Sequence, residues 1–370
     1  MGALTLFLVA GEPSGDRLGA ALMAGLKSLA DVRFVGVGGP LMQAEGLVSL
    51  FAMEELSVMG IAEVLPKYLH LKRRIRETAA ACIASGARAL ITIDSPDFSF
   101  RVAKLVKAGS AMKTIHYVAP SVWAWRPGRA AKMAGHIDHV LALLPFEPPY
   151  MTAQGMSCDF VGHPVVAEAL ATPQPRTTPL ILTLPGSRIS EVRRLMPVFG
   201  QVLARVKAMH PGARVALPTV RGVVGLVCEM AKDWPIAPHI IEDVEAKRQA
   251  FADATVALAA SGTVSLELAA NAVPMVIAYD MNPITLWLMH RAALVDTVTL
   301  VNLVSDTRVV PEFIGARCNA DLIAPALLGL MDGPLRIQQM AAMDVTMDRL
   351  GRGGAAPGLR AARSVLANIG

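Results

Sequence analysis

The sequence lacks the cysteine patterns that mark a disulfide framework or a zinc site. Its four cysteines lie far apart, with no Cys-x-x-Cys pair and no histidine-rich neighbourhood: Cys82, Cys158, Cys228 and Cys318. This spacing excludes the disulfide-rich secreted class and favours a reducing compartment. We therefore expect neither a metal ion nor another cofactor.

Long hydrophobic runs are also missing, and aromatic residues are few. No stretch reaches the roughly eighteen uninterrupted apolar residues of a membrane-spanning helix. The apolar segment 4–10 has no basic region before it and ends at a Gly-Glu-Pro turn, so it predicts a first strand and not a signal peptide. Because 53% of the residues are hydrophobic and only 5% aromatic, we expect α/β layers with strands buried on both faces.

The charge and the length of the chain limit its partners and its organisation. The net charge of +5 favours an anionic partner and leaves nucleic acid, phospholipid and a phosphorylated substrate open. With 370 residues the chain can form two domains of about 100–200 residues each. The segment 171–179, rich in proline and threonine, is the best linker. We expect one domain over 1–170, a second over 180–345 and a helical tail over 346–370.

One strand–turn–helix–strand unit, 254–279, organises the second half of the chain. Its turn consists of three small residues: Ser261, Gly262 and Thr263. Backbone N–H groups and the positive dipole end at such a helix start favour an anion, and Glu267 lies one turn further on, within reach of a sugar. A diphosphate attached to a ribose fits this pattern. The alternative is an ordinary turn in which Ser261 or Thr263 only caps the helix.

A second turn of the same kind follows the predicted strand 180–184. Its residues Gly186, Ser187 and Arg188 begin a helix, and Arg188 supplies a charged donor for a phosphate. Both halves thus repeat a strand, a glycine-containing turn and a helix. The sequence predicts two Rossmann-like domains with parallel sheets.

The first half carries carboxylates where predicted strands end. Glu12 lies in the turn 11–16 after the first strand, together with Ser14 and Gly15, and capping explains it poorly. Asp94 follows the predicted strand 89–93, at the edge where open α/β sheets bind ligands, and is a general-base candidate. Capping of the next helix explains Asp97 well.

Two further segments of the first half have more than one interpretation. Trp123 and Trp125 lie two apart in one loop, either as buried anchors or as a wall of a substrate site. His163 is a lone histidine, more often structural than catalytic. The segment 59–77 mixes apolar with basic residues: Ile61, Leu65, Tyr68 and Leu69 with Lys72, Arg73 and Arg74. It is either a solvated helix face or a patch for acyl chains and anionic headgroups.

Seven motifs together resemble those of the bacterial lipid A disaccharide synthases, in the family's order and over most of the chain. They are 11–16 (GEPSGD), 94–98 (DSPDF), 121–125 (SVWAW), 144–147 (LPFE), 161–164 (VGHP), 184–188 (LPGSR) and 261–267 (SGTVSLE). The resemblance implies a GT-B fold, in which two Rossmann-like domains face each other over a cleft, and a C-terminal helix that returns to the N-terminal domain.

The resemblance also implies a reaction and a location. Such enzymes are inverting glycosyltransferases that move 2,3-diacylglucosamine from UDP to the 6-hydroxyl of 2,3-diacylglucosamine 1-phosphate and release UDP. They associate peripherally with the cytoplasmic side of the inner membrane, where the segment 59–77 would dock. No nucleic-acid partner is expected, and a homodimer is left open.

The residues and the resemblance together suggest roles for the motifs. Asp94 is the expected base. Glu12 is expected either to support this base or to orient the acceptor. The other residues expected around the acceptor are Ser14, Gly15, Asp97, Trp123 and Trp125. Since no Asp-x-Asp pair is present, the helix starts and Arg188 are expected to carry the charge of the leaving UDP. The expected UDP contacts are Gly186, Ser187, Arg188, Ser261, Gly262, Thr263 and Glu267, with Asn302 and Arg308 added on the resemblance alone.

Four positions depart from the family pattern, and two other classes of function remain. Ala119 stands where a serine is usual, Ser99 where an asparagine is, Val301 where a proline is, and Gly315 where a glutamine is. These departures bear on substrate fit more than on activity. The alternatives are another GT-B transferase or epimerase on a UDP-N-acetylglucosamine-type substrate, and a non-catalytic module that binds nucleotide or lipid.

Overall fold

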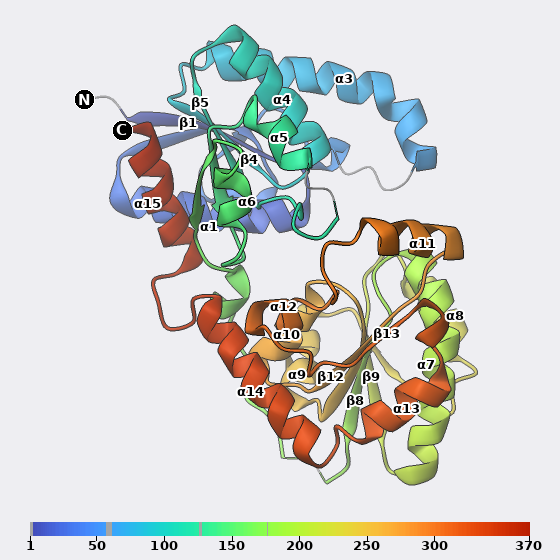
Figure 1. Ribbon diagram of the computed structural model, residues 1–370. Coiled ribbons are helices and arrows are strands. Elements are labelled where there is room, and N and C mark those ends of the chain that lie inside the picture. Colours follow the sequence, from blue (N-terminus) through green and yellow to red (C-terminus); the bar gives the residue numbers. More distant parts are fainter. Residues whose placement is uncertain (1–2, 57–60, 126–127, 176) are drawn as a thin grey trace. The chain divides into compact units, whose positions relative to one another are not determined.

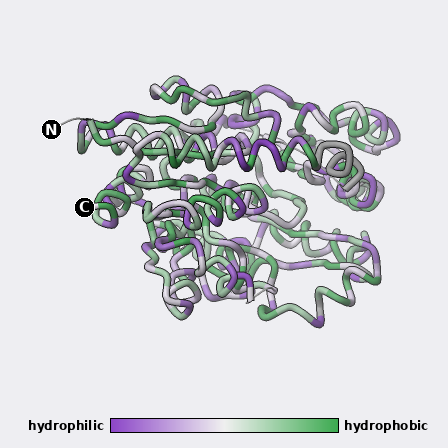
Figure 2. The backbone as a smooth tube through the Cα atoms, turned by 90° about the horizontal axis from the view of Figure 1, so that it is seen from above, coloured by the Kyte–Doolittle hydropathy of each residue, from purple (hydrophilic) through white to green (hydrophobic). Residues whose placement is uncertain are grey.

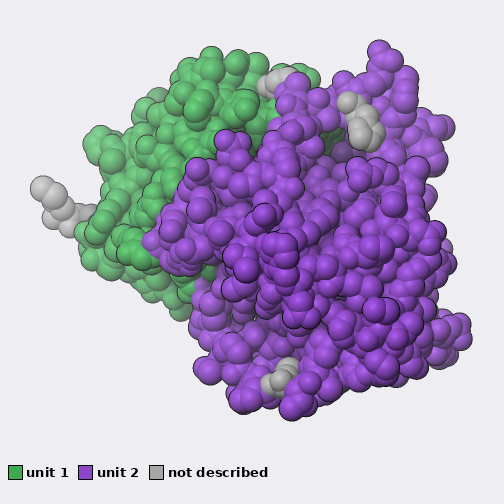
Figure 3. Space-filling view, turned by 60° about the horizontal axis from the view of Figure 1, so that its bottom comes forward, with its two compact units in different colours: residues 1–167, 353–370 green, residues 168–352 purple. Residues whose placement is uncertain are grey.

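The chain folds into two compact units (Figure 3). Each unit contains its own parallel sheet. The computed structural model describes residues 3–56, 61–125, 128–175 and 177–370, except for the side chains of 61–68 and 290. Unit 1 comprises residues 1–167 and 353–370, and unit 2 comprises residues 168–352. Among the described residues, no helix has the length and hydropathy needed to cross a membrane.

Unit 1 contains a seven-stranded sheet of order β3-β2-β1-β4-β5-β6-β7, in which neighbouring strands are parallel (Figure 1). Its strands are β1 (Leu4–Ala10), β2 (Val32–Val37), β3 (Val48–Ser49), β4 (Ala89–Ile93), β5 (Lys113–Tyr117), β6 (His139–Ala142) and β7 (Ser157–Phe160). Its α-helices are α1 (Pro13–Leu29), α2 (Pro40–Ala44), α3 (Ile61–Ala84), α4 (Pro96–Gly109), α5 (Gly128–Ala134), α6 (Pro148–Thr152) and α15 (Pro357–Ile369). Two 3₁₀ helices, η1 (Met53–Leu56) and η2 (Pro164–Ala167), complete it.

The apolar strands of unit 1 bury side chains on both faces of the sheet. Along β1, Leu6 and Leu8 pack into one hydrophobic cluster, and Phe7 and Val9 pack into another. This alternation follows from the two-residue period of a strand. Because both faces are covered by helices, the strand is buried and apolar from Leu6 to Ala10, as strands of parallel sheets generally are.

The C-terminal helix α15 belongs to unit 1, as the sequence predicts, and packs against α1 (Figure 1). Two glycines permit the close approach of these helices. A Cβ on Gly358 would lie 2.5 Å from the carbonyl oxygen of Ala21, and one on Gly25 would lie 2.7 Å from that of Gly358. Both distances are too short for any larger residue without movement of the helices.

Unit 2 contains a six-stranded sheet of order β10-β9-β8-β11-β12-β13, also parallel between neighbours. Its strands are β8 (Leu180–Leu184), β9 (Arg214–Pro218), β10 (His239–Ile241), β11 (Val256–Ala260), β12 (Met275–Tyr279) and β13 (Glu312–Ile314). Its helices are α7 (Ile189–Met209), α8 (Val224–Ala231), α9 (Val244–Asp253), α10 (Val264–Ala270), α11 (Pro283–Ala292), α12 (Leu300–Ser305), η3 (Gly315–Arg317), α13 (Ala320–Leu328) and α14 (Pro334–Arg349).

Several helices are amphipathic, among them α1, α4, α7 and α15. Figure 2 shows hydrophobic and hydrophilic residues alternating along the helical turns of the chain. In α7 the buried residues Val192, Leu195, Met196 and Phe199 recur at helical spacing and join the main core cluster of unit 2. Helices of this kind obtain their stability from the sheet that they cover.

Each sheet has one position where the strand order reverses, and the predicted motifs lie there. In unit 1 this position lies between β1 and β4, with Ala10 opposite Ile93. In unit 2 it lies between β8 and β11, with Leu184 opposite Ala259. Loops leave such neighbouring strands in opposite directions, so ligands bind between them.

Candidate functional site

Asp94 lies at the carboxyl end of β4 in a strained turn. Asp94 and Ser95 both have left-handed backbones, with φ values of 52° and 44°. Asp94 Oδ1 accepts a hydrogen bond from the Ser95 amide at 2.8 Å, and Ser14 Oγ lies within 3.4 Å of Asp94 Oδ2 as a donor. Non-glycine residues rarely adopt this conformation, and such strain gathers at functional sites.

Neighbouring backbone and side-chain groups hold this turn in place. The Asp94 amide donates to the carbonyl oxygen of Tyr117 at 3.0 Å, and Ser99 Oγ donates to the carbonyl oxygen of Asp94 at 2.7 Å. A Cβ at position 11 would lie 2.7 Å from Ser95 Oγ, so a larger residue there would require the Ser95 side chain to shift. Ser99, one of the departures from the family pattern, therefore supports the Asp94 turn.

The other predicted residues of unit 1 occupy different environments. Glu12 is the exposed N-cap residue of α1, and its side chain makes no capping hydrogen bond. The side chain of Asp97 is 98% exposed, and its Oδ1 lies 3.8 Å from Arg129 Nη2. Gly15 is buried, and a Cβ there would lie 3.2 Å from the carbonyl oxygen of Ile93. Gly15 thus allows α1 to approach β4.

Sequence reasoning did not identify the structural role of Asp16, the last residue of the GEPSGD motif. Asp16 is 3% exposed and accepts hydrogen bonds, each of 3.0 Å, from the amides of Gly39, Leu41 and Met42. Its carboxylate therefore caps α2, although it lies 23 residues before Gly39 in the chain. The only sequence feature that pointed to this contact was the Gly-Gly-Pro loop at residues 38–40, after β2.

The two tryptophans of the SVWAW motif have separate positions. Trp123 is 7% exposed; its Nε1 donates to Glu147 Oε1 at 3.2 Å, and its ring meets Phe146 edge-on at a centroid distance of 5.1 Å. Trp123 is therefore a buried anchor. Trp125 is 38% exposed, at the surface of the same loop. His163 is partly buried; desolvation of its ring lowers its pKa to about 4, and its Nδ1 accepts from the Val165 amide, a contact that suits a structural residue.

Unit 2 has a cavity of about 480 Å³ at the carboxyl ends of β8 and β11. It is lined by seven residues that the sequence assigned to a UDP contact: Gly186, Ser187, Arg188, Ser261, Gly262, Thr263 and Glu267. They come from two turns that lie more than seventy residues apart in the chain. The parallel pairing of β8 with β11 brings these turns together.

Glu191 organises the first of these turns and was not assigned a role from the sequence. Its Oε2 accepts from the amides of Ser187 and Arg188 at 3.2 and 3.3 Å, and its Oε1 accepts from Arg188 Nη1 at 2.9 Å. A Cβ on Gly186, whose φ is 105°, would lie 2.4 Å from Glu191 Oε2. The Arg188 side chain nevertheless remains 73% exposed at the cavity.

The second turn is accompanied by a lysine that sequence reasoning also did not identify. Lys247 of α9 lines the cavity, and its Nζ lies 2.7 Å from Glu267 Oε2. No local pattern connects these residues, because they lie 20 positions apart on different helices. Thr219 and Val220, which follow β9, also line the cavity.

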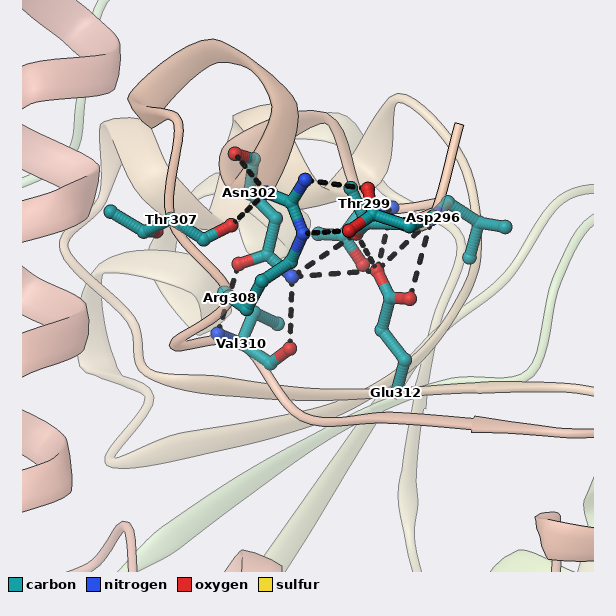
Figure 4. Close-up of polar contacts among 9 residues, drawn as sticks. Asp296, Thr299, Asn302, Thr307, Arg308, Val310 and Glu312 are labelled. Carbon is teal, nitrogen blue, oxygen red and sulfur yellow. Dashed lines mark hydrogen bonds and ion pairs between the residues drawn. The ribbon is translucent and has the colours of Figure 1, made fainter. Parts of the chain in front are cut away.

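Asn302 and Arg308 lie outside the residues that line this cavity, and their contact with UDP stays a prediction. Asn302 is 1% exposed; its Nδ2 donates to the carbonyl oxygen of Val310, and its Oδ1 accepts from the Val310 amide, both at 3.0 Å. Arg308 pairs with Asp296, at 3.0 Å for Nε to Oδ2 (Figure 4). Both side chains are thus engaged within the protein.

Glu312, which lies close to Asn302, holds the loop 297–299 beside the Ser261 turn. Glu312 accepts from the hydroxyl of Thr297 and from the amides of Val298 and Thr299 (Figure 4). Ser261 Oγ in turn donates to the carbonyl oxygen of Val298 at 3.4 Å. Asn302 and Glu312 therefore support one wall of the cavity from behind.

The predicted lipid-facing segment lies on α3, where the description of side chains begins at Leu69. Ile61, Leu65 and Tyr68 have side chains outside the described residues. Leu69 is 77% exposed, and Lys72 and Arg73 are exposed as well.

Arg74 differs from its exposed neighbours on α3. Its side chain is 16% exposed and pairs with Glu55 and Glu77, each at 2.7 Å. The Arg74 hydrogen bond lowers the pKa of Glu55. Contact of Arg74 with lipid headgroups stays a prediction, and in this structure its guanidinium is paired with two carboxylates. On another side of α3, Ile75, Ala79 and Cys82 are buried.

The described part of the chain contains no group of three or more histidine, cysteine, aspartate or glutamate residues arranged to hold a metal ion. The cavity of unit 2 instead presents hydroxyl groups, backbone amides and two cations, Arg188 and Lys247. Such groups bind phosphates and sugar hydroxyls.

Solved structures similar to this chain in fold, each with two Rossmann-like units, include glycosyltransferases and epimerases. A putative UDP-N-acetylglucosamine 2-epimerase from Listeria monocytogenes has a TM-score of 0.66 at 12% identity, covering 100% of this chain and 96% of that one. The UDP co-structure of S. aureus MnaA has a TM-score of 0.64 at 12% identity, covering 99% and 97%. The glycotransferase of kitacinnamycin has a TM-score of 0.65 at 14% identity, covering 100% of both. The fold is therefore of the GT-B type.

The sequence comparisons identify the family within this fold. The model of the family described as lipid-A-disaccharide synthetase matches residues 6–354. The lipid-A-disaccharide synthase of Ruegeria pomeroyi is 58% identical over 382 residues, covering 98% of this chain and 95% of the relative. That of Rhodospirillum centenum is 46% identical, covering 99% and 95%. The chain belongs to the lipid-A-disaccharide synthase family, whose members are glycosyltransferases of lipid A biosynthesis.

Proposed function

We propose that this enzyme transfers 2,3-diacylglucosamine from UDP to the 6-hydroxyl of 2,3-diacylglucosamine 1-phosphate, with inversion at the anomeric carbon. The acceptor oxygen forms a bond to C1 of the donor, and the bond from C1 to the diphosphate oxygen breaks. UDP leaves with that electron pair, and the proton of the acceptor hydroxyl passes to a base. The observation that carries the proposal is the convergence of the two family turns on one cavity of unit 2.

The cavity suits the nucleotide part of the donor. The Ser261–Thr263 turn and Arg188 lie where a diphosphate would accept hydrogen bonds, and Glu267 would accept from the ribose hydroxyls. Arg188 would stabilise the negative charge that develops on the leaving diphosphate, which is where electrostatic catalysis acts. Its present partner Glu191 fixes the guanidinium at the cavity.

Asp94 is the proposed base. It follows a parallel strand at the reversal of the sheet order, and its strained turn is held by Tyr117 and Ser99. Ser14 and Glu12 belong to the adjacent turn after β1 and would orient the acceptor. Asp97 is a weaker candidate because its side chain is 98% exposed and pairs only distantly with Arg129.

Both substrates carry acyl chains, so we propose that the protein works at the cytoplasmic surface of the inner membrane. Each CH₂ kept out of water is worth about 0.8 kcal/mol, which makes extraction of a diacylated lipid into solution costly. On unit 1, Leu69 with Lys72 and Arg73 offers apolar and basic side chains to an anionic surface. On unit 2, Ile284 and Trp287 of α11 are 71% and 55% exposed, which also suits contact with acyl chains.

A two-substrate reaction tests the proposal against its alternatives. The purified protein, given UDP-2,3-diacylglucosamine and 2,3-diacylglucosamine 1-phosphate in mixed micelles, should release UDP and form the disaccharide. UDP-N-acetylglucosamine should be a poor donor and should not be epimerised. Epimerisation without transfer, or UDP binding without turnover on any of these donors, would reject the proposal.

A further inference from the structure

The cavity of unit 2 contains an ion pair in which one partner, Lys247, lies outside the family motifs. Lys247 Nζ lies 2.7 Å from Glu267 Oε2, with the two side chains 42% and 33% exposed. The lysine comes from α9 and the glutamate from the first turn of α10. Lys247 also lies over the buried ring of Phe251, 5.2 Å from its centroid.

We propose that Lys247 is a positioning residue for the ribose: it orients Glu267 so that this carboxylate can accept hydrogen bonds from the 2′ and 3′ hydroxyls of UDP. The inference rests on the proposed function, which places the nucleotide in this cavity. Lys247 itself need not touch the ligand, because it acts through the glutamate.

The geometry explains why such a partner is needed. A glutamate has three side-chain torsions, and a half-exposed carboxylate would otherwise sample several of them. The ammonium group binds Oε2, and the packing of the lysine on Phe251 limits where that ammonium can lie. One orientation of the carboxylate is therefore favoured before the ribose arrives, so less entropy is lost on binding.

A direct contact between Lys247 and the diphosphate is the competing role. The lysine lines the same cavity as Arg188, and both are cations. The two roles predict different effects of Lys247 on nucleotide affinity. If Lys247 positions Glu267, its effect requires both Glu267 and the ribose hydroxyls, whereas the effect of a direct phosphate contact requires neither.

A double-mutant cycle read with two nucleotides separates these roles. Calorimetry would measure the dissociation constants of UDP and of 2′,3′-dideoxy-UDP for the wild type, Lys247→Met, Glu267→Gln and the double variant. Lys247→Met should raise the dissociation constant of UDP by about threefold to fivefold, the upper range for a partly exposed ion pair. The dissociation constant of the dideoxy nucleotide should remain nearly unchanged. In the Glu267→Gln background the same change should have no further effect.

Two further variants make the result specific. Lys247→Arg keeps the cation and should retain most of the preference for UDP over the dideoxy nucleotide. Lys232→Met removes an exposed lysine that pairs with Glu229 on the neighbouring helix α8 and should change neither affinity. A merely structural role of Lys247 would lower both affinities together.

The contrary results are equally distinct. The positioning role would be overturned if Lys247→Met weakened the binding of both nucleotides equally. It would also be overturned if Lys247→Met still weakened UDP binding in the Glu267→Gln background. If Glu267→Gln itself leaves the preference for UDP over the dideoxy nucleotide intact, the ribose assignment in the proposed function fails as well. If it removes that preference while Lys247→Met does not, only the inference about Lys247 fails.

Discussion

The indole N–H of Trp123 donates to the buried carboxylate of Glu147, with Nε1 and Oε1 3.2 Å apart. Glu147 Oε2 also accepts from the amides of Leu143 and Leu144, at 3.1 and 3.0 Å. One side chain thus joins the SVWAW loop to the end of β6. Burial raises the pKa of Glu147 to about 7, although all three hydrogen bonds act in the opposite direction.

This raised pKa makes the stability of the fold depend on pH. Between its ordinary value of 4.5 and about 7, Glu147 binds more protons in the folded than in the unfolded state. Its contribution is therefore fully present below the ordinary value and is lost as the pH rises through about 7. The free energy of unfolding of the wild type should therefore fall between about pH 5 and pH 8. In Glu147→Gln this fall should be smaller by roughly 1–3 kcal/mol.

Urea unfolding of both proteins at the two pH values measures this difference. Glu229→Gln, at an exposed carboxylate on α8, is the control and should follow the wild type. A wild type and a Glu147→Gln variant with parallel pH dependence would show that Glu147 does not titrate in this range.

Asp94→Asn should lower turnover by roughly 10²–10⁴-fold, the usual contribution of a positioned general base. The change removes the proton acceptor and preserves the shape of the side chain, so UDP affinity should remain near that of the wild type. Steady-state turnover together with calorimetric UDP binding measures both quantities. Asp97→Asn tests the weaker, exposed candidate and should lower turnover less than Asp94→Asn does. Nearly normal turnover of Asp94→Asn, with strong loss in Asp97→Asn, would reverse the assignment.

Arg188→Ala should weaken UDP binding by roughly 1.5–3 kcal/mol, the range of a hydrogen bond to a charged group. The 73% exposure of its side chain favours the lower end of that range, because solvent screens the charge. Calorimetry with UDP is the measurement. Arg205→Ala is the matched control, since Arg205 belongs to the same helix α7 but pairs with Asp321. Unchanged UDP affinity in Arg188→Ala would reject the proposed phosphate contact.

The membrane contact on α3 can be tested with an i, i+4 pair. Leu69→Ser with Arg73→Glu should weaken binding to anionic vesicles by roughly tenfold to hundredfold, because it removes an apolar contact and reverses a charge. Arg74 is left intact, since it holds Glu55. The control makes the same two changes on α4, at Leu105 and Arg101, which have the same spacing and are exposed.

Vesicle co-sedimentation at low and high salt compares the two double variants. The α3 variant should remain in the supernatant, and the α4 variant should sediment like the wild type. Equal sedimentation of all three proteins would show that this part of α3 is a solvated helix face.

The sequence predicts the local elements and the turns at strand ends because these depend on short patterns. Apolar runs identify β1 and β11, and the turn at Ser261 follows from its small residues. Partners distant in sequence could not be predicted in this way. The contact of Lys247 with Glu267, and that of Glu147 with Trp123, depends on which helices and loops the sheet brings together.

The supporting position of Asn302 shows a second limit. A motif indicates that a residue matters near a site, but it does not say whether the side chain reaches the ligand. Burial and hydrogen-bond partners add what the motif lacks, since Asn302 uses its amide for Val310. Likewise, the sequence gives the charge of Arg74 but not its ion pair with Glu55.

The most direct test of the central claim is the product formed from a donor labelled with ¹³C at C1 of its glucosamine. After incubation with 2,3-diacylglucosamine 1-phosphate, NMR should show a β-configured anomeric carbon linked to C6 of the acceptor, with one UDP released per disaccharide. Asp94→Asn should form the same product slowly. An α-configured product, linkage at another hydroxyl, or labelled free sugar without disaccharide would contradict an inverting transfer to the 6-hydroxyl.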